Sequence, residues 1–303
     1  MFANSVPEVG EAGVIAQNGK VSLEFDDRGG AGGEPLLLLM GLGVSRYWWP
    51  DGFITALIEG GYHVAVFDGR DAGGSTHFED GPAANPLSAL FKRKQPIYTA
   101  EDMTDDAVAV MDALGWPDAH LFGQSQGGLV AQRTALRHPQ RVRTLTSCSA
   151  VPSDARGAAV LRYVRLPFLA RIARARFPEG REGDIAAGMA MARAVSAGPI
   201  DEEEARTRVE RELDAGLVSG VRDSRAMARQ TGATWHGPPL SSLRLPTLVL
   251  HGSDDPMCRP SAGRRVAASV PGARYVELAG TGHDLPPATW PTVVREMRSL
   301  WNQ

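Results

Sequence analysis

The sequence predicts an α/β fold in which a mostly parallel sheet carries helices on both faces. Short apolar runs, typical of strands that are covered on both faces, alternate along the chain with segments of helical spacing. One long region breaks this alternation with helical sequence alone, which indicates an insertion between two strands. The 303 residues, with 43% hydrophobic and 22% charged content, are typical of a globular protein with a large core.

The first elements expected are a hairpin, two buried strands and a short helix. Residues 13–29 alternate around an Asn-Gly dipeptide, which suits the two positive-φ positions of a tight turn. The apolar run PLLLLMG, residues 35–41, predicts a buried strand, and a helix is expected at 53–59. The segment YHVAVFDGRDAGGS, residues 62–75, predicts a second buried strand that ends in a glycine-rich turn.

The middle of the chain opens with a capping box from Thr99 to Asp102, which predicts the start of a helix. The apolar residues that follow keep helical spacing: Ala107, Val110, Met111 and Leu114. Three further elements are predicted in sequence, a strand at 119–124, a helix at 126–138 and a strand at 142–150.

The C-terminal part returns to the alternation of strands and helices. It predicts a strand at 247–252, a helix at 262–269, a strand at 274–280 and a terminal helix from Pro291. Between about Ser153 and His236 no strand pattern is found. We therefore expect a core domain made of residues 1–152 and 237–303, and a helical cap, residues 153–236, inserted between two strands.

Charge and cysteine content argue against several classes of partner. The 32 basic and 35 acidic residues give a net charge of −3, which offers no reason to expect nucleic acid or a membrane as partner. The two cysteines, Cys148 and Cys258, fit a reducing compartment. No apolar run approaches 18 residues and the first 10 residues carry no secretion signal, so a cytoplasmic location is expected. The pattern does not indicate an oligomeric state.

The most informative motif is Gly123-Gln124-Ser125-Gln126-Gly127, a G-x-S-x-G pattern between a predicted strand and a predicted helix. Glycine on both sides permits a sharp turn, where larger side chains would collide with neighbouring elements. The serine would stand at a helix N-terminus, whose free N–H groups favour a developing oxyanion. This context indicates a nucleophile, where the alternative is a glycine-rich turn with an incidental serine.

A serine nucleophile needs a base and an acid, which are expected downstream in the order Ser, Asp or Glu, His. The segment TLVLHGSDDPM offers Asp254 and Asp255 on the loop after a buried strand. We favour Asp255, three residues past Gly252, and expect Asp254 on the loop surface. The segment LAGTGHDLP supplies His283 as the base, in a loop between glycine and proline residues.

An oxyanion hole needs two donors. One is expected to be the backbone N–H of Gln126, the residue after the nucleophile. The other should come from the loop after the first buried strand, where the N–H of Leu42 is the best candidate.

Other reactive side chains have structural explanations. Cys148 lies near the end of a strand, where cysteine normally acts as a small buried hydrophobe rather than a nucleophile. His251 is expected to be packed on the strand that leads to the acid, His138 to end a helix and His63 to open a strand. Surface or cap positions are expected for the remaining three: His77, His120 and His236.

Four aromatic residues are candidates for an apolar substrate pocket between cap and sheet, although core packing would explain each of them equally well: Trp48, Trp49, Phe168 and Trp235. No cluster of histidine, cysteine and carboxylate residues has the spacing of metal ligands. We therefore expect neither a metal nor a cofactor.

Together these features resemble the α/β-hydrolase superfamily over nearly the whole chain. Within it, the chain is similar to the aclacinomycin methylesterase family, on the segments LLLLMG, FDGRDAGGST, DMTDDAVAVMDALG and LAGTGHDLP. The resemblance implies an α/β sheet with a helical cap, and it supports Ser125, Asp255 and His283 as a catalytic triad. The chain departs from its relatives at Gln124 and Gln126, where an apolar residue and methionine are common.

The resemblance implies hydrolysis of a carboxylic ester of a small molecule, in the type member a methyl ester on an aromatic polyketide glycoside. A lactonase, a thioesterase or a C–C bond hydrolase could use the same triad, and a non-catalytic small-molecule-binding protein could share the fold. Because the triad and both oxyanion donors lie outside 153–236, we expect the cap to decide substrate choice and not the chemistry.

Overall fold

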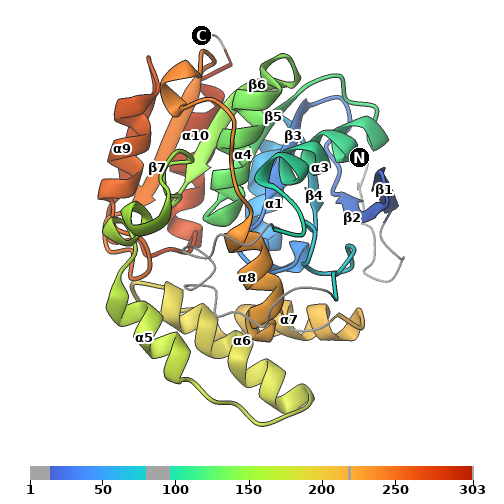
Figure 1. Ribbon diagram of the computed structural model, residues 1–303, viewed down its shortest axis with the longest axis vertical. Coiled ribbons are helices and arrows are strands. Elements are labelled where there is room, and N and C mark those ends of the chain that lie inside the picture. Colours follow the sequence, from blue (N-terminus) through green and yellow to red (C-terminus); the bar gives the residue numbers. More distant parts are fainter. Residues whose placement is uncertain (1–13, 80–95, 218–219, 302–303) are drawn as a thin grey trace.

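The computed structural model describes residues 14–79, 96–217 and 220–301, and Figure 1 shows a central sheet with helices around it. Residues 1–13, on which the expected absence of a secretion signal rests, lie outside the described residues. Among the described helices, none is both long and apolar enough to cross a membrane.

The sheet has eight strands in the order β1-β2-β4-β3-β5-β6-β7-β8. β2 pairs antiparallel with β1 and β4, and all other neighbours are parallel. The strands are β1 Val14–Asn18, β2 Val21–Asp27, β3 Glu34–Leu39, β4 Tyr62–Phe67, β5 Ala119–Gln124, β6 Val142–Cys148, β7 Thr247–Gly252 and β8 Arg274–Leu278. The predicted mostly parallel sheet is therefore confirmed.

Helices cover both faces of the sheet, as predicted. They are α1 Asp51–Glu59, α3 Ala100–Ala113, α4 Gln126–Arg137, α9 Ser261–Ser269 and α10 Trp290–Arg298. Apolar residues of α3, α4 and α9 form one buried cluster, and those of α1 and α10 form another. Single turns of 3-10 helix connect these elements: η1 Arg46–Trp48, η2 Pro139–Arg141, η5 Leu240–Ser242 and η6 Pro287–Thr289.

The run of four leucines in β3 supplies both clusters. Leu36 and Leu38 pack toward α1 and α10, whereas Leu37 and Leu39 pack toward α3, α4 and α9. Successive side chains of a strand point to opposite faces, so a strand covered on both sides needs an unbroken apolar run. Full burial of each leucine is worth roughly 1.5–3 kcal/mol.

Two local predictions are confirmed in atomic detail. The hairpin turns at Gly19, which has φ +61°, and Asn18 pairs with Val21. The capping box at the start of α3 is complete: the Thr99 hydroxyl accepts from the Asp102 N–H at 3.2 Å, and the Asp102 carboxylate accepts from the Thr99 N–H at 2.6 Å.

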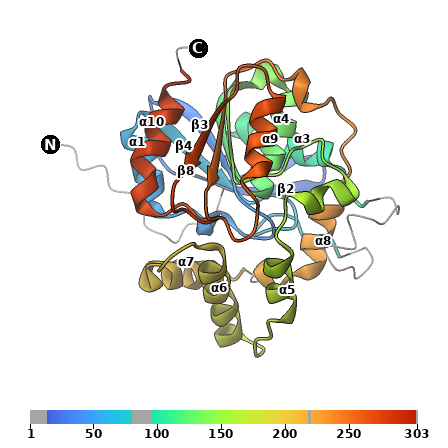
Figure 2. The ribbon, with the colours of Figure 1, turned by 90° about the vertical axis from the view of Figure 1, so that its left-hand side faces the viewer.

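The segment between β6 and β7 contributes helices and no strand of the sheet among the described residues. These are η3 Gly157–Arg162, α5 Leu166–Arg174, α6 Arg181–Val195, α7 Glu202–Asp214, η4 Gly220–Arg222 and α8 Ser224–Gly232. Figures 1 and 2 show α5, α6 and α7 gathered together below the sheet. We call residues 153–236 the insertion.

The glycine-rich turn after β4 carries charged side chains that form buried ion pairs with other parts of the chain. The fully buried Asp68 carboxylate pairs with the Arg46 guanidinium and accepts from the Arg46 N–H at 2.5 Å. Arg70 pairs with Asp106 of α3 at 2.6 Å. Asp71, at φ +63°, accepts two bonds from Arg229 of α8 and one from Tyr98. This segment therefore joins the sheet, α3 and the insertion.

Candidate active site

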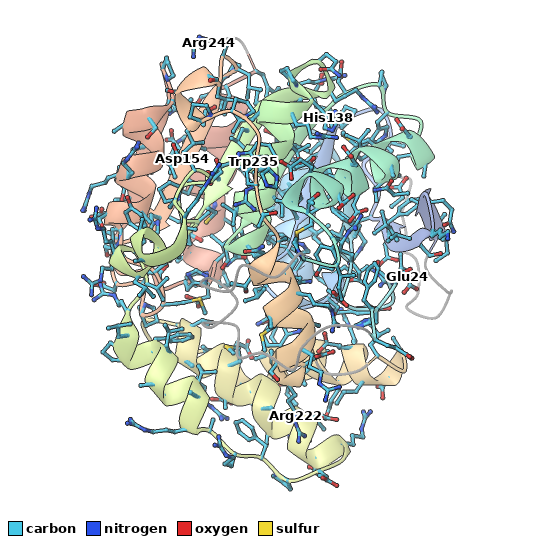
Figure 3. All side chains as sticks on the ribbon, in the orientation of Figure 1. Glu24, His138, Asp154, Arg222, Trp235 and Arg244 are labelled. Atoms are coloured by element: carbon cyan, nitrogen blue, oxygen red, sulfur yellow. The ribbon has the colours of Figure 1, made fainter. Side chains whose placement is uncertain are left out.

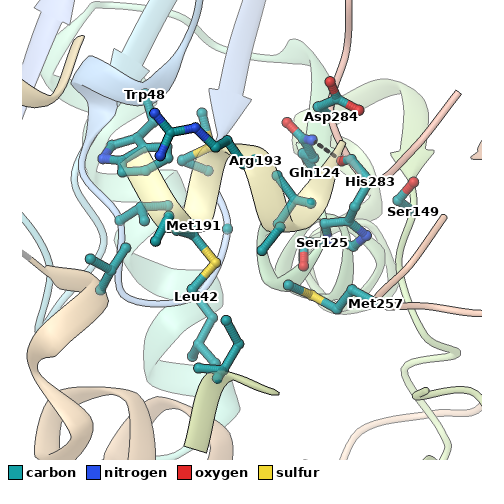
Figure 4. Close-up of a pocket in the computed structure, with 18 of the residues that line it drawn as sticks. Leu42, Trp48, Gln124, Ser125, Ser149, Met191, Arg193, Met257, His283 and Asp284 are labelled. Atoms are coloured by element: carbon teal, nitrogen blue, oxygen red, sulfur yellow. Dashed lines mark hydrogen bonds between the residues drawn. The ribbon is translucent and has the colours of Figure 1, made fainter. Parts of the chain in front are cut away.

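Ser125 occupies the turn between β5 and α4. Its backbone has φ +56° and ψ −120°, a region that residues with side chains rarely adopt. The strain persists because the surrounding chain fixes this turn: the Ser125 N–H donates to the Cys148 carbonyl of β6 at 2.8 Å. The side chain lines a large cavity (Figure 4).

The flanking glycines are required by space. A Cβ on Gly123 would lie 2.3 Å from the Gly127 carbonyl oxygen, and a Cβ on Gly127 would lie 2.0 Å from the Leu39 carbonyl oxygen of β3. Real Cβ atoms do not approach backbone oxygens so closely. The collision inferred from the G-x-S-x-G motif therefore exists at both glycines.

Asp255 and His283 are paired beside this turn. The Asp255 carboxylate is fully buried, and its Oδ2 lies 2.7 Å from His283 Nδ1. Its Oδ1 accepts from the backbone N–H groups of Met257 at 2.8 Å and Cys258 at 2.7 Å. Asp254 is exposed, and its carboxylate accepts from the Ser253 hydroxyl at 3.2 Å. The structure therefore brings Asp255, and not Asp254, to His283.

The environment of Asp255 favours its ionised form. Burial alone would raise the pKa of this carboxyl, but the charge of His283 and hydrogen bonds from His251, His283 and the Cys258 N–H outweigh it. The net pKa lies well below its ordinary value. An ionised carboxylate accepts a hydrogen bond from the N–H at His283 Nδ1, which leaves the lone pair on Nε2.

The free nitrogen of His283 belongs to the same cavity as Ser125. Nε2 is buried and has no hydrogen-bond partner among the described residues. Figure 4 shows the imidazole beside Ser125, and both residues line the cavity. A buried nitrogen that is left without a partner is costly unless a substrate or a catalytic step uses it.

His251 contributes a contact that sequence reasoning missed. Its burial on β7 was expected, but its Nε2 also lies 3.3 Å from Asp255 Oδ2. The loop turns back directly after β7, with the Asp255 N–H donating to the Gly252 carbonyl at 3.4 Å. A histidine four residues before the acid was the available signal, but strand geometry alone does not predict that contact.

Three contacts fix the loops that carry the acid and the base. Gln124, whose role the motif left open, donates from Nε2 to the His283 carbonyl at 2.6 Å (Figure 4). The His283 N–H donates to the Val195 carbonyl, at the end of α6, at 2.7 Å. Arg165 of the insertion donates from Nε to the Asp255 carbonyl at 2.8 Å. The insertion therefore touches both loops.

The two predicted oxyanion donors border Ser125. Gln126 is the first residue of α4, so its N–H has no partner within the helix. Gly41 lies near the serine, since a Cβ on Gly41 would meet Ser125 Cβ at an ordinary contact distance of 3.5 Å. Leu42, the next residue, lines the cavity (Figure 4).

The cavity measures about 1760 Å³ and extends from Ser125 to the insertion. Of the predicted pocket aromatics, Trp48 and Phe168 line it. Trp49 is buried in the core instead and stacks on Phe53 with ring centroids 6.0 Å apart. Small-molecule sites usually measure roughly 300–1,000 Å³, so this cavity has room for a large ligand.

The assignment of Trp235 to the pocket is wrong. Its side chain is buried in the core cluster of α3 and α4, with the Arg133 guanidinium 5.7 Å from the ring. Figure 3 shows it level with the sheet, well above Arg222 of the insertion. The chain has already returned to the core here, because the Thr234 carbonyl accepts from the Ala100 N–H at the start of α3.

Cys148 and His120 are both buried and do not line the cavity that holds Ser125. Cys148 is buried, which raises the pKa of its thiol to about 12 and keeps it protonated, as expected for a structural cysteine. His120 was expected at the surface but is buried, because the start of β5 faces Tyr62 and Trp301. Within the described ranges, no group of three His, Cys, Asp or Glu side chains is arranged to hold a metal ion.

The chain is similar in sequence to known hydrolases. Residues 34–286 match the family model described as alpha/beta hydrolase fold. The chain is 30% identical to the rhodomycin D methylesterase of Streptomyces sp. strain C5, over 88% of this chain and 90% of that protein. It is 29% identical to the rhodomycin D methylesterase of Streptomyces peucetius, over 89% and 91%.

Solved structures show the same fold at lower identity. A meta-cleavage product hydrolase from Pseudomonas fluorescens IP01 superposes with a TM-score of 0.70 at 22% identity, covering 96% of this chain and 98% of that one. An enol-lactonase from Burkholderia xenovorans LB400 superposes with a TM-score of 0.66 at 22% identity, covering 96% and 100%.

Proposed function

The chain belongs to the alpha/beta hydrolase fold family, and we propose that it is a serine hydrolase that cleaves a carboxylic ester without a cofactor. The observation that carries the proposal is one cavity that contains a serine on a strained strand-to-helix turn and a histidine nitrogen with no hydrogen-bond partner among the described residues. That histidine is hydrogen-bonded on its far side to a buried carboxylate. A nucleophile, a base and an orienting acid have this arrangement.

In the first half-reaction, Ser125 Oγ attacks the ester carbonyl while His283 Nε2 takes the hydroxyl proton. Asp255 holds the imidazole in the required tautomer and stabilises the cation that forms. The N–H groups of Gln126 and Leu42 bind the oxyanion of the tetrahedral intermediate. The bond to the alcohol oxygen then breaks, and His283 returns the proton to the leaving alkoxide.

In the second half-reaction, a water molecule attacks the acyl group on Ser125 and gives one proton to His283. The second tetrahedral intermediate collapses, the proton moves to Ser125 Oγ, and the carboxylic acid leaves. One water is consumed for one acid and one alcohol, and the enzyme returns to its starting state.

The substrate we propose is a methyl ester of a bulky, largely apolar acid. The cavity is large, and the residues near Ser125 and on the insertion are mainly apolar, among them Met40, Leu42, Trp48, Met191 and Met257. Two relatives at about 30% identity are named for a methylesterase activity. We propose that the insertion acts as a cap over this cavity.

The test uses purified protein and a panel of methyl esters, larger alkyl esters, lactones and thioesters, with methanol and acid release measured directly. A fluorophosphonate probe with peptide mapping should label Ser125. Ser149 provides a matched control, because it also lines the cavity and has a positive φ of 48°. Ser125→Ala should abolish turnover and labelling, and Ser149→Ala should preserve both. Labelling without turnover of any panel member would disprove ester hydrolysis, and no labelling would favour a binding protein.

A further inference from the structure

We propose that Gln230 and Glu212, two buried side chains of the insertion, are positioning residues that hold the oxyanion loop, residues 41–49. They act on catalysis through the N–H of Leu42. The inference rests on the proposed function, since it takes that N–H as an oxyanion donor. It also changes the role expected for the insertion, from substrate choice alone to part of the catalytic assembly.

The loop needs support from outside because its own sequence does not fix it. Leu42 lies between Gly41 and Gly43, and glycine permits backbone conformations that other residues exclude. Gly43 uses this freedom, with φ +69°. An oxyanion donor contributes fully only when it already points at the developing charge, so both flanks of Leu42 must be held.

Gln230 of α8 holds one flank. Its Oε1 accepts from the Gly43 N–H at 3.0 Å, and its Nε2 donates to the Arg70 carbonyl at 2.8 Å. The amide is 4% exposed. Arg70 is itself fixed by its ion pair with Asp106, so Gln230 connects a glycine-flanked loop to a rigid cluster of the core.

Glu212 of α7 holds the loop further along. Its Oε1 accepts from the Ser45 hydroxyl at 2.7 Å and lies 3.4 Å from the Ser45 N–H. Its Oε2 accepts from the Trp48 indole at 3.3 Å. A third bond from the insertion runs from Arg208 to the Trp48 carbonyl at 3.0 Å.

The setting of Glu212 indicates a specific role. The carboxylate is 1% exposed, and within the described part of the chain no Lys, Arg or His nitrogen lies within 4.0 Å of it. Burial and the charge of Asp68 raise the pKa of Glu212, and hydrogen bonds from Ser45 and Trp48 oppose that rise only in part. The three groups that contact the carboxyl, which are the Ser45 hydroxyl, the Ser45 N–H and the Trp48 indole, all belong to the oxyanion loop. A buried carboxylate is costly without such partners.

Backbone packing joins the same two parts. A Cβ on Gly220 would lie 1.5 Å from the Gly43 carbonyl oxygen, and a Cβ on Gly43 would lie 2.7 Å from Met227 Cγ of α8. The insertion and the oxyanion loop are therefore in direct contact at Gly43. On the other side of Leu42, Gly41 lies near Ser125, because a Cβ on Gly41 would meet Ser125 Cβ at an ordinary contact distance of 3.5 Å. The oxyanion loop therefore lies between the nucleophile and the insertion.

The test compares variants that remove the hydrogen bonds from the insertion to the oxyanion loop. Gln230→Met is nearly isosteric and removes both bonds, and Gln230→Glu keeps an acceptor for Gly43 while losing the donor to Arg70. Glu212→Gln is the milder change at the second site. Asp214→Asn is the control, because it breaks an exposed ion pair between Asp214 of α7 and Arg181 of α6, and neither residue lines the cavity.

Removing an oxyanion donor outright costs about 10²–10³ in kcat. A donor that is present but loosely held should cost less, so we expect kcat per active site to fall roughly 10–100-fold in Gln230→Met. KM should stay within about threefold, because the substrate ground state does not use the donor. Phosphonate titration corrects for the active fraction. Gln230→Glu and Glu212→Gln should be intermediate, and Asp214→Asn should match the wild type.

Two readouts separate positioning from general loss of structure. Affinity for a trifluoromethyl ketone, which forms an oxyanion on the serine, should fall in parallel with kcat/KM, while affinity for the product acid stays unchanged. Hydrogen exchange of peptides covering 41–49 should accelerate. Unchanged kcat and ketone affinity in all three variants, or an equal loss in Asp214→Asn, would overturn the inference. If the proposed function itself is wrong, the wild type will show neither turnover nor labelling.

Discussion

Replacing Asp255 with asparagine should lower kcat about 10⁴-fold, or about 5.5 kcal/mol in the barrier, without unfolding the protein. The structure specifies why. One carboxylate oxygen accepts from two backbone N–H groups, of Met257 and Cys258, and the other faces His283 Nδ1. An asparagine oxygen must stay with the two backbone donors, since an amide NH₂ cannot accept from them.

The amide NH₂ would then face His283 as a donor. His283 Nδ1 would have to accept, which places the imidazole proton on Nε2, the nitrogen directed at the cavity. That tautomer cannot take the proton of Ser125. The loss therefore comes from the wrong tautomer and not from a missing side chain, which is why a nearly isosteric change should be so costly.

The assay is kcat for a methyl ester at pH 7, corrected for the active fraction, with Asp254→Asn as the control. Asp254 is exposed, and among the described residues its carboxylate bonds only to the neighbouring Ser253 hydroxyl, so its variant should stay within about threefold of the wild type. A loss below tenfold in Asp255→Asn, or an equal loss in both variants, would refute the reasoning.

Three further predictions concern the pocket, the turn and acid stability. Phe168→Ala removes a large side chain from the cavity wall, so the ratio of kcat/KM between bulky and small acyl groups should shift by about 1–3 kcal/mol. Equal slowing of both substrates would contradict a role in selection. Gly127→Ala should lower the free energy of unfolding by about 3 kcal/mol in urea titrations, because its Cβ would lie 2.0 Å from the Leu39 carbonyl; an unchanged midpoint would rule out this crowding. The depressed pKa of Asp255 means that its carboxylate stabilises the fold above the ordinary value of 3.8 and loses that contribution as pH falls. The difference in unfolding free energy between wild type and Asp255→Asn should therefore be largest at neutral pH and shrink below about pH 4, and a difference independent of pH would contradict this.

The features that sequence predicted well are those that local chemistry determines. The Asn-Gly turn at 18–19, the Thr99 capping box and the leucine run of β3 each act within a few residues, and all three are confirmed. The G-x-S-x-G motif belongs to the same class, because its glycines are dictated by the width of a single turn. The division of the chain at 153 and 236 stays a prediction.

The features that sequence missed depend on partners far along the chain. Trp235 looked like part of a helical region, yet the chain had already returned to α3, more than 130 residues earlier, as the bond between Glu101 and the His236 N–H shows. His120 is buried by Trp301, which contacts it in space although it lies near the C-terminal end of the sequence. Neither contact leaves a periodic signal, since each depends on how elements pack after they have formed.

Contacts between distant segments also decide whether the insertion affects the chemistry or only the choice of substrate. In sequence, the expected triad and oxyanion donors all lie outside the insertion, which suggested that the insertion could vary without affecting the chemistry. In space, the insertion contacts the base loop through Val195, the acid loop through Arg165 and the oxyanion loop through Gln230. The contact at Val195 joins two backbone groups, which any residue can supply, so it tolerates change in sequence. The bonds from Arg165 and Gln230 use specific side chains of the insertion, so they do not tolerate such change. Substitutions in the insertion should therefore divide into two groups. Those at cavity-lining apolar positions such as Phe168 should alter selectivity alone, and those at Gln230 and Glu212 should lower kcat for every ester alike.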